Sequence, residues 1–136
     1  GGVNPTAAGV ALLRICDALD DGTVEKVTEY VTGSQRADGG FPAHAKAPQP
    51  DLMSTFTALI SLRDLERLDR AELAGAARFA RKLRDANGGF RGAEIHDRPD
   101  VEYTFYGLGV LGLLSAHAVR VRERKSEMSA GGSWCR

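Results

Sequence analysis

The residues that could bind a ligand fall into two sets, which recur at one spacing along the chain. Each set joins an aspartate, a threonine and aromatic residues within a few positions. The free N–H groups of a helix N-terminus attract a diphosphate or a carboxylate, and aromatic rings line grooves for apolar ligands. The same residue types also fit a plainer role, since Asp and Thr cap helices while Phe and Tyr pack in cores. The candidate ligand-binding residues are Asp51, Thr55, Phe56, Asp100, Tyr103, Thr104, Phe105 and Tyr106.

The chain contains an internal repeat with a period of 49 residues. Gly39-Gly40-Phe41 recurs as Gly88-Gly89-Phe90, and Pro50-Asp51 recurs as Pro99-Asp100, with one offset and no gap. Thr6 lies one further period upstream of the first threonine in these sets. An ungapped repeat of this size predicts stacked copies of one supersecondary unit.

Each repeat unit is predicted to hold a buried inner helix and an amphipathic outer helix. The inner segments are apolar on most sides, so all three are expected to be buried, whereas the outer segments carry an apolar stripe at helical spacing. No stretch alternates with period two for long, so the sequence predicts an all-α fold without a sheet of consequence. The inner helices are expected at 7–19, 55–68 and 104–119, and the outer helices at 23–36 and 70–84.

A Gly-Gly-Phe turn is expected to end each outer helix. Asp38 or Asn87 before the glycine pair suits a left-handed residue that stops a helix. The phenylalanine that follows, Phe41 or Phe90, should wedge between successive helical pairs. The repeats form one predicted domain over 1–125, and residues 126–136 lose the periodicity and are expected to form a flexible tail.

These segments resemble a known family. Residues 35–41 (QRADGGF) and 84–90 (RDANGGF) look like the Q-x-x-x-G-G-F/W repeat of terpenoid cyclases and protein prenyltransferase β subunits. Residues 100–108 (DVEYTFYGL) are similar to the prenyltransferase segment D-x-x-H-T-x-x-G-L. The resemblance implies an α/α toroid, of which this chain supplies an incomplete ring of about two and a half helical pairs. A second copy or a partner chain is therefore expected to complete the ring.

The resemblance also implies where catalytic zinc would bind. In protein prenyltransferases an Asp, a Cys and a His hold the metal; Asp51 matches the Asp, but the other positions are Met53 and Tyr103. Thioether and phenol are poor zinc ligands. The acidic motifs of terpene cyclases are missing, and residues 17–21 (DALDD) have the wrong spacing. We expect no metal site and no cofactor unless a partner supplies zinc ligands, and the sequence leaves open whether the chain is an enzyme.

Composition excludes some partners. Lysines plus arginines equal aspartates plus glutamates at 18 each, so no electrostatic attraction to nucleic acid is expected. We predict no membrane span and no signal peptide. Cys16 is expected to be a small core residue, and a bacterial cytoplasm fits the two unpaired cysteines and the Ala-, Arg- and Gly-rich usage. The three histidines share no ligand spacing.

Three functions remain open. The first is a toroid-type domain that binds an isoprenoid or another apolar ligand or peptide, without the zinc chemistry of the family. The second is a subunit or fragment of an active prenyltransferase or terpene cyclase. The third is a folded carrier that presents a C-terminal Ser-Trp-Cys-Arg peptide for modification, because Trp134 and Cys135 follow a double glycine.

Overall fold

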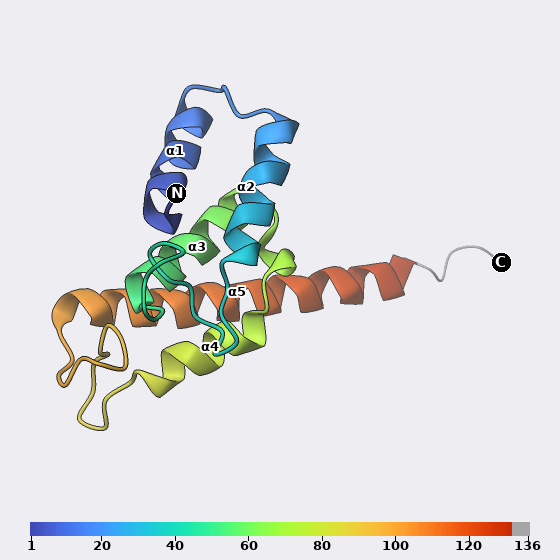
Figure 1. Cartoon of the computed structure of the whole chain (residues 1–136). Helices are drawn as coiled ribbons and strands as arrows, with labels where there is room; N and C mark the ends of the chain where they lie inside the picture. Colours follow the sequence, from blue (N-terminus) through green and yellow to red (C-terminus); the bar gives the residue numbers. More distant parts are fainter. Residues whose placement is uncertain (132–136) are drawn as a thin grey trace.

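The computed structural model describes residues 1–131, and this part of the chain is all α-helical with no strand. Four isolated β-bridges connect its loops. The predicted absence of a sheet is confirmed. The elements in chain order are α1 (Val3–Ile15), α2 (Asp21–Gly33), α3 (Leu52–Asp64), the 3₁₀ turn η1 (Leu68–Arg70), α4 (Leu73–Lys82) and α5 (Val101–Gly131) (Figure 1).

The helices form two layers, as the repeat predicts. The inner helices α1, α3 and α5 pack against one another in chain order, while α2 packs on α3 and α4 packs on α5. Each outer helix thus covers the inner helix of the following repeat. Figure 1 shows that α5 continues well beyond this two-layered body.

The core is centred on α3. Leu52, Leu59 and Leu62 are fully buried along this helix, and Phe41 and Phe90 from the Gly-Gly-Phe turns join the same hydrophobic cluster. The predicted burial of α3 and of both phenylalanines is confirmed.

The predicted burial of the other two inner helices is wrong for much of their surface. On α1, Leu12 is 61% exposed and Ile15 is 81% exposed. On α5, Val101 is 88% exposed and Phe105 is 61% exposed. The reason is position in the stack: among residues 1–131, α3 has an inner helix on each side, whereas α1 and α5 each have one inner neighbour.

The inner helices begin three or four residues earlier than predicted. Gly2 and Asp51 are the N-caps of α1 and α3, and Asp100 precedes α5. The repeated threonine therefore lies in the first turn, where its backbone is already helical, and not at the cap.

The inner helices also end differently from one another. The chain leaves α1 and α3 through left-handed residues at the same repeat position, Asp17 (φ 52°) and Glu66 (φ 58°). Ser115 occupies this position in the third repeat and stays helical, so α5 extends over 31 residues. Helix α5 passes the position at which the predicted tail begins, since residues 126–131 are still helical.

Cys16 is not a core residue. It is exposed and forms the C-cap of α1. The predicted helix continued to 19, which would have placed Cys16 on an apolar face, but α1 ends one residue before it.

Candidate functional site

The N-terminal ends of α3 and α5 are held by the two predicted aspartates. Asp51 Oδ1 accepts a hydrogen bond from the Ser54 backbone N–H at 2.8 Å, and Asp51 Oδ2 accepts one from Ser54 Oγ at 2.8 Å. Asp100 Oδ1 accepts from the Tyr103 backbone N–H at 2.8 Å. Both carboxylates therefore act as helix caps, and N–H groups that could have met a diphosphate are already bonded.

The two predicted threonines connect each inner helix to the Gly-Gly-Phe turn before it. Thr55 Oγ1 donates to the Asp51 carbonyl at 2.7 Å and accepts from the Phe41 N–H at 3.0 Å. The third repeat copies both bonds, with Thr104 bound to the Asp100 carbonyl at 2.6 Å and to the Phe90 N–H at 3.0 Å. These contacts make the threonines structural links between turn and helix.

The predicted aromatic residues come together where α3 meets the first two turns of α5. The ring centroids of Phe56 and Phe105 lie 5.8 Å apart, those of Phe56 and Tyr106 lie 5.8 Å apart, and those of Phe105 and Tyr106 lie 5.3 Å apart. Tyr103 extends the group, with its ring 6.4 Å from that of Tyr106. We call these four residues the aromatic cluster.

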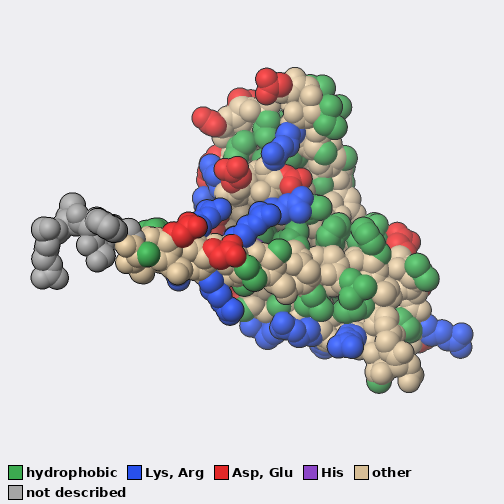
Figure 2. All heavy atoms as spheres, turned by 180° about the vertical axis from the view of Figure 1, so that it is seen from behind, with side chains coloured by type: hydrophobic (Ala, Val, Ile, Leu, Met, Phe, Trp, Pro, Cys, Tyr) green, Lys and Arg blue, Asp and Glu red, His purple; other side chains and the backbone are tan. Residues whose placement is uncertain are grey.

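The aromatic cluster is packed on one side and open on the other. Phe56, Tyr103 and Tyr106 are partly buried against the core, whereas Phe105 is largely exposed. Figure 2 shows hydrophobic side chains gathered on the surface of the two-layered body, away from the protruding end of α5. The cluster thus presents the Phe105 ring to solvent, while its other rings pack against the core.

One member of this surface was missed from the sequence. The His96 ring, from the loop before α5, lies 5.5 Å from the Tyr103 ring. His96 has no counterpart at its position in the preceding repeat, where Ala47 stands. Only the folded path of the loop brings it to Tyr103.

The two tyrosines of the cluster remain neutral phenols over a wide pH range. Burial raises the pKa of Tyr103 above its usual value of 10.0, and the negative charges of Asp51, Glu102 and Asp100 raise it further. Burial also raises the pKa of Tyr106, with a further contribution from Glu102. The surface at the N-terminal ends of α3 and α5 therefore combines the carboxylates of Asp51, Asp100 and Glu102 with the rings of neutral tyrosines.

The side chains at the zinc positions of the family do not match a zinc donor set. Both Asp51 oxygens are engaged by Ser54, Met53 offers only a thioether, and Tyr103 is held in its neutral form. No group of three or more His, Cys, Asp and Glu side chains gathers anywhere in residues 1–131. In the segment that distantly resembles an acid motif, Asp20 caps α2 by accepting from the Thr23 N–H at 2.9 Å.

Two further sequence predictions concern the C-terminal part. The predicted tail residues Trp134 and Cys135 lie outside the residues that the structure describes. Helix α5 has the length and composition of a membrane-crossing helix over Val101–Ala130. That match is one of length and composition alone. Helix α5 also packs on α3 and α4, and its residues Val110, Leu111 and Leu114 belong to the hydrophobic core or pack against it.

Comparison with known families decides the classification. The model of the prenyltransferase alpha-alpha toroid domain matches residues 2–136. The chain belongs to this family. A search of curated proteins finds no match. The predicted family and fold are thus confirmed. Membership of the family does not identify a ligand, because one fold can carry several activities.

Proposed function

We propose that this toroid domain binds an isoprenoid, or another elongated apolar ligand, on its aromatic cluster and performs no zinc chemistry of its own. The observation that carries the proposal is the partly open packing of Phe56, Phe105 and Tyr106. Apolar surface removed from water contributes about 25 cal/mol per Å² to binding. Because these rings already pack against one another, a ligand that covers them does not have to immobilise them, and this saves conformational entropy.

The charges around the cluster favour a neutral ligand over a diphosphate. Burial raises the pKa of Tyr103, and the negative charges of Asp51, Glu102 and Asp100 raise it further. Two of these carboxylates also occupy the helix N-termini, where an anion would otherwise bind. An alcohol or another neutral head group avoids this repulsion and accepts a hydrogen bond from the neutral tyrosine hydroxyl.

Native mass spectrometry with farnesol tests the proposal. Phe105→Ser removes the most exposed ring, and because Phe105 is 61% exposed the fold should be retained. Val119→Ser is the matched control, since Val119 is also exposed on α5 but has no aromatic partner in the cluster. We expect farnesol adducts on the wild type and on V119S, and at least about a tenfold loss of affinity in F105S. Equal adduct formation by all three proteins would overturn the proposal.

A partner chain or second copy that completes the ring is a second candidate, favoured by the two exposed ends of the stack. Val101 and Leu108 on α5 and Leu12 and Ile15 on α1 leave large apolar side chains in contact with solvent. Exposed apolar side chains that lie together on a surface mark interaction sites in soluble proteins. A partner could also supply the ligands that an active transferase or cyclase needs.

Sedimentation velocity tests the second candidate on the α1 end, away from the aromatic cluster. If two copies complete the ring, the wild type should sediment as a dimer, and Ile15→Ser should shift it toward monomer. A wild type that remains monomeric at high concentration would exclude a second copy and leave a different partner chain as the candidate.

A further inference from the structure

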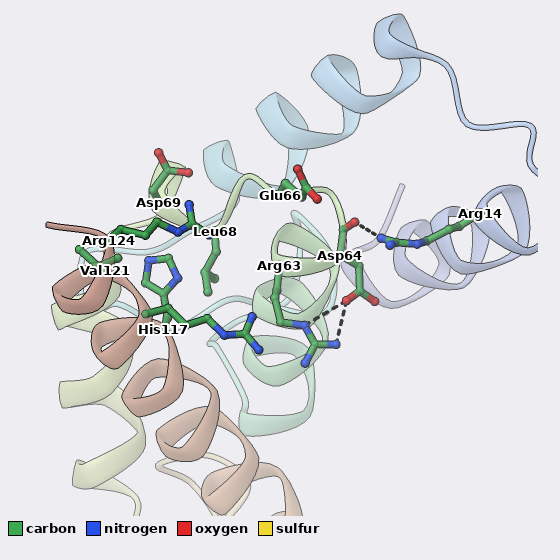
Figure 3. Close-up of a pocket in the computed structure, with 10 residues that line it drawn as sticks. Arg14, Arg63, Asp64, Glu66, Leu68, Asp69, His117, Val121 and Arg124 are labelled. Atoms are coloured by element: carbon green, nitrogen blue, oxygen red, sulfur yellow. Dashed lines mark hydrogen bonds and ion pairs between the residues drawn. The ribbon is translucent and has the colours of Figure 1, made fainter. Parts of the chain in front are cut away.

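Figure 3 shows the side chains that line a cavity of about 590 Å³. It lies between the C-terminal ends of α1 and α3, the η1 turn, and the part of α5 that begins to leave the body. Four arginines and one histidine line it: Arg14, Arg63, His117, Arg120 and Arg124. Three carboxylates, Asp64, Glu66 and Asp69, line it as well.

Two of the four arginines already have structural partners. Arg63 Nη2 lies 2.7 Å from Asp64 Oδ1, and the Arg14 guanidinium donates to the Asp64 carbonyl. Both are in the last turn of their helices, where a cation offsets the negative end of the helix dipole. Their presence therefore needs no ligand.

The other two arginines are different. Arg120 and Arg124 lie inside α5, far from its last turn, so the helix dipole does not account for them. Neither forms an ion pair with any residue of the described 1–131. With His117 they follow a spacing of three and four residues, which places them on one face of the helix, and all three line the cavity. Arg122, on another face, is not among the lining residues.

A smaller hollow of about 70 Å³ adjoins these cations. Leu68, Leu113 and Ala116 line it together with Arg63, His117 and Arg120, and it shares Leu68 and the three basic residues with the larger cavity. The combination provides hydrogen-bond donors for an anion next to space for a few apolar atoms.

We propose that this cavity binds a phosphate-bearing ligand, with its phosphate or diphosphate group held by Arg120 and Arg124 and hydrogen-bonded by His117. Planar guanidinium groups match the paired oxygens of phosphate, and two of them on successive turns of one helix can contact a single group. The phosphate can belong to a soluble ester or to a lipid head group. The proposal is independent of isoprenoid binding, because the two sites lie at opposite ends of α3.

Isothermal titration with inorganic diphosphate tests the site, in metal-free buffer at about 150 mM salt so that unspecific attraction is screened. The double variant Arg120→Gln/Arg124→Gln should bind at least about tenfold more weakly than the wild type. Arg122→Gln is the matched control, since it removes the same charge from the same helix outside the cavity, and its affinity should change less than about twofold. The F105S protein should bind diphosphate normally, which separates this site from the aromatic cluster.

Vesicle pelleting distinguishes the two sources of phosphate. If the ligand is a lipid, the protein should pellet with phosphatidylcholine vesicles that contain phosphatidic acid but not with pure phosphatidylcholine, and R120Q/R124Q should abolish pelleting while R122Q should not. If it is soluble, only the diphosphate titration should show the dependence on these arginines. An equal loss in R122Q and in the double variant, or no binding in either assay, would overturn the proposal.

Discussion

At the residue scale, the repeated threonine has the best-defined role in this molecule. Thr55 Oγ1 is the hydrogen-bond acceptor for the buried Phe41 N–H. Thr55→Val keeps the shape but leaves this donor without a partner, which costs about 1–3 kcal/mol. Chemical denaturation should therefore show Thr55→Val lowering the free energy of unfolding by about 2 kcal/mol.

Two matched substitutions check this explanation. Thr104 makes the same bonds in a less buried setting, so Thr104→Val should cost less than Thr55→Val. Thr6 makes only the bond to the Gly2 carbonyl, and Thr6→Val should cost least. Equal losses at all three positions would mean that the link to the turn contributes nothing.

Because the tyrosines of the aromatic cluster have raised pKa values, we expect the free energy of unfolding to fall at alkaline pH. The pKa of Tyr103 is raised in the folded protein above its usual value of 10.0. Its contribution is therefore fully present below pH 10 and is lost as the pH rises through the folded-state pKa. Unfolding followed against pH should show stability falling above about pH 10, and Tyr103→Phe should make the fall less steep. An unchanged slope in Y103F would contradict the assignment.

The role of a single residue could be predicted from the sequence where that role depends only on neighbouring residues in the chain. Aspartates at 51 and 100 stand immediately before apolar helices, and their capping bonds follow from that. The position of Cys16 could not be predicted, because it depends on where α1 stops, and left-handed Asp17 decides that. The approach of His96 to Tyr103 depends on a loop path that no local pattern specifies.

At the element scale, the two Gly-Gly-Phe turns differ in what surrounds them. Gly39 (φ +94°) lies against the backbone of Gly75 in α4, so a Cβ there would overlap it. Gly88 (φ +98°) has the same left-handed backbone but open space around it. The first turn packs on the next outer helix, while the second has no such helix to meet within residues 1–131.

This difference predicts unequal costs for one substitution. Gly88→Ala should lose about 1–2 kcal/mol from backbone strain alone. Gly39→Ala should lose at least about 3 kcal/mol, because strain and overlap with α4 add. Thermal denaturation of the two variants measures the gap, and similar melting temperatures would refute the packing difference between the turns.

The protruding end of α5 should contribute little to stability. Residues 126–130 are exposed helix beyond the two-layered body. Removal of residues 126–136 should therefore change the free energy of unfolding by less than about 0.5 kcal/mol. A larger loss, measured by urea denaturation, would show that this segment packs on the domain or on a second copy.

At the scale of the whole molecule, the repeat predicts the two layers correctly but not which inner helices are buried. Helical periodicity reports the local apolar pattern, and α1, α3 and α5 all carry an inner-helix pattern. Burial also depends on neighbours, and only α3 has one on both sides. Within residues 1–131, the exposed apolar faces thus belong to the two inner helices that have one inner neighbour instead of two.

The aromatic cluster could also be predicted only in part. The repeat predicts that the rings lie near the N-termini of the inner helices. Their contacts with one another depend on how α3 and α5 pack together, which the repeat does not specify. The cavity lined by Arg120 and Arg124 could not be predicted from the sequence. It forms because α5 stays helical at Ser115, where α1 and α3 have already ended, and so places these two arginines beyond the end of α3.

The most direct test of isoprenoid binding is photo-crosslinking with a diazirine-bearing farnesol analogue, followed by peptide mapping. We predict that crosslinks fall within 52–60 of α3 and 101–110 of α5, and that excess farnesol competes them away. Crosslinks confined to α1, or to the protruding end of α5, would contradict a binding surface built on Phe56, Phe105 and Tyr106.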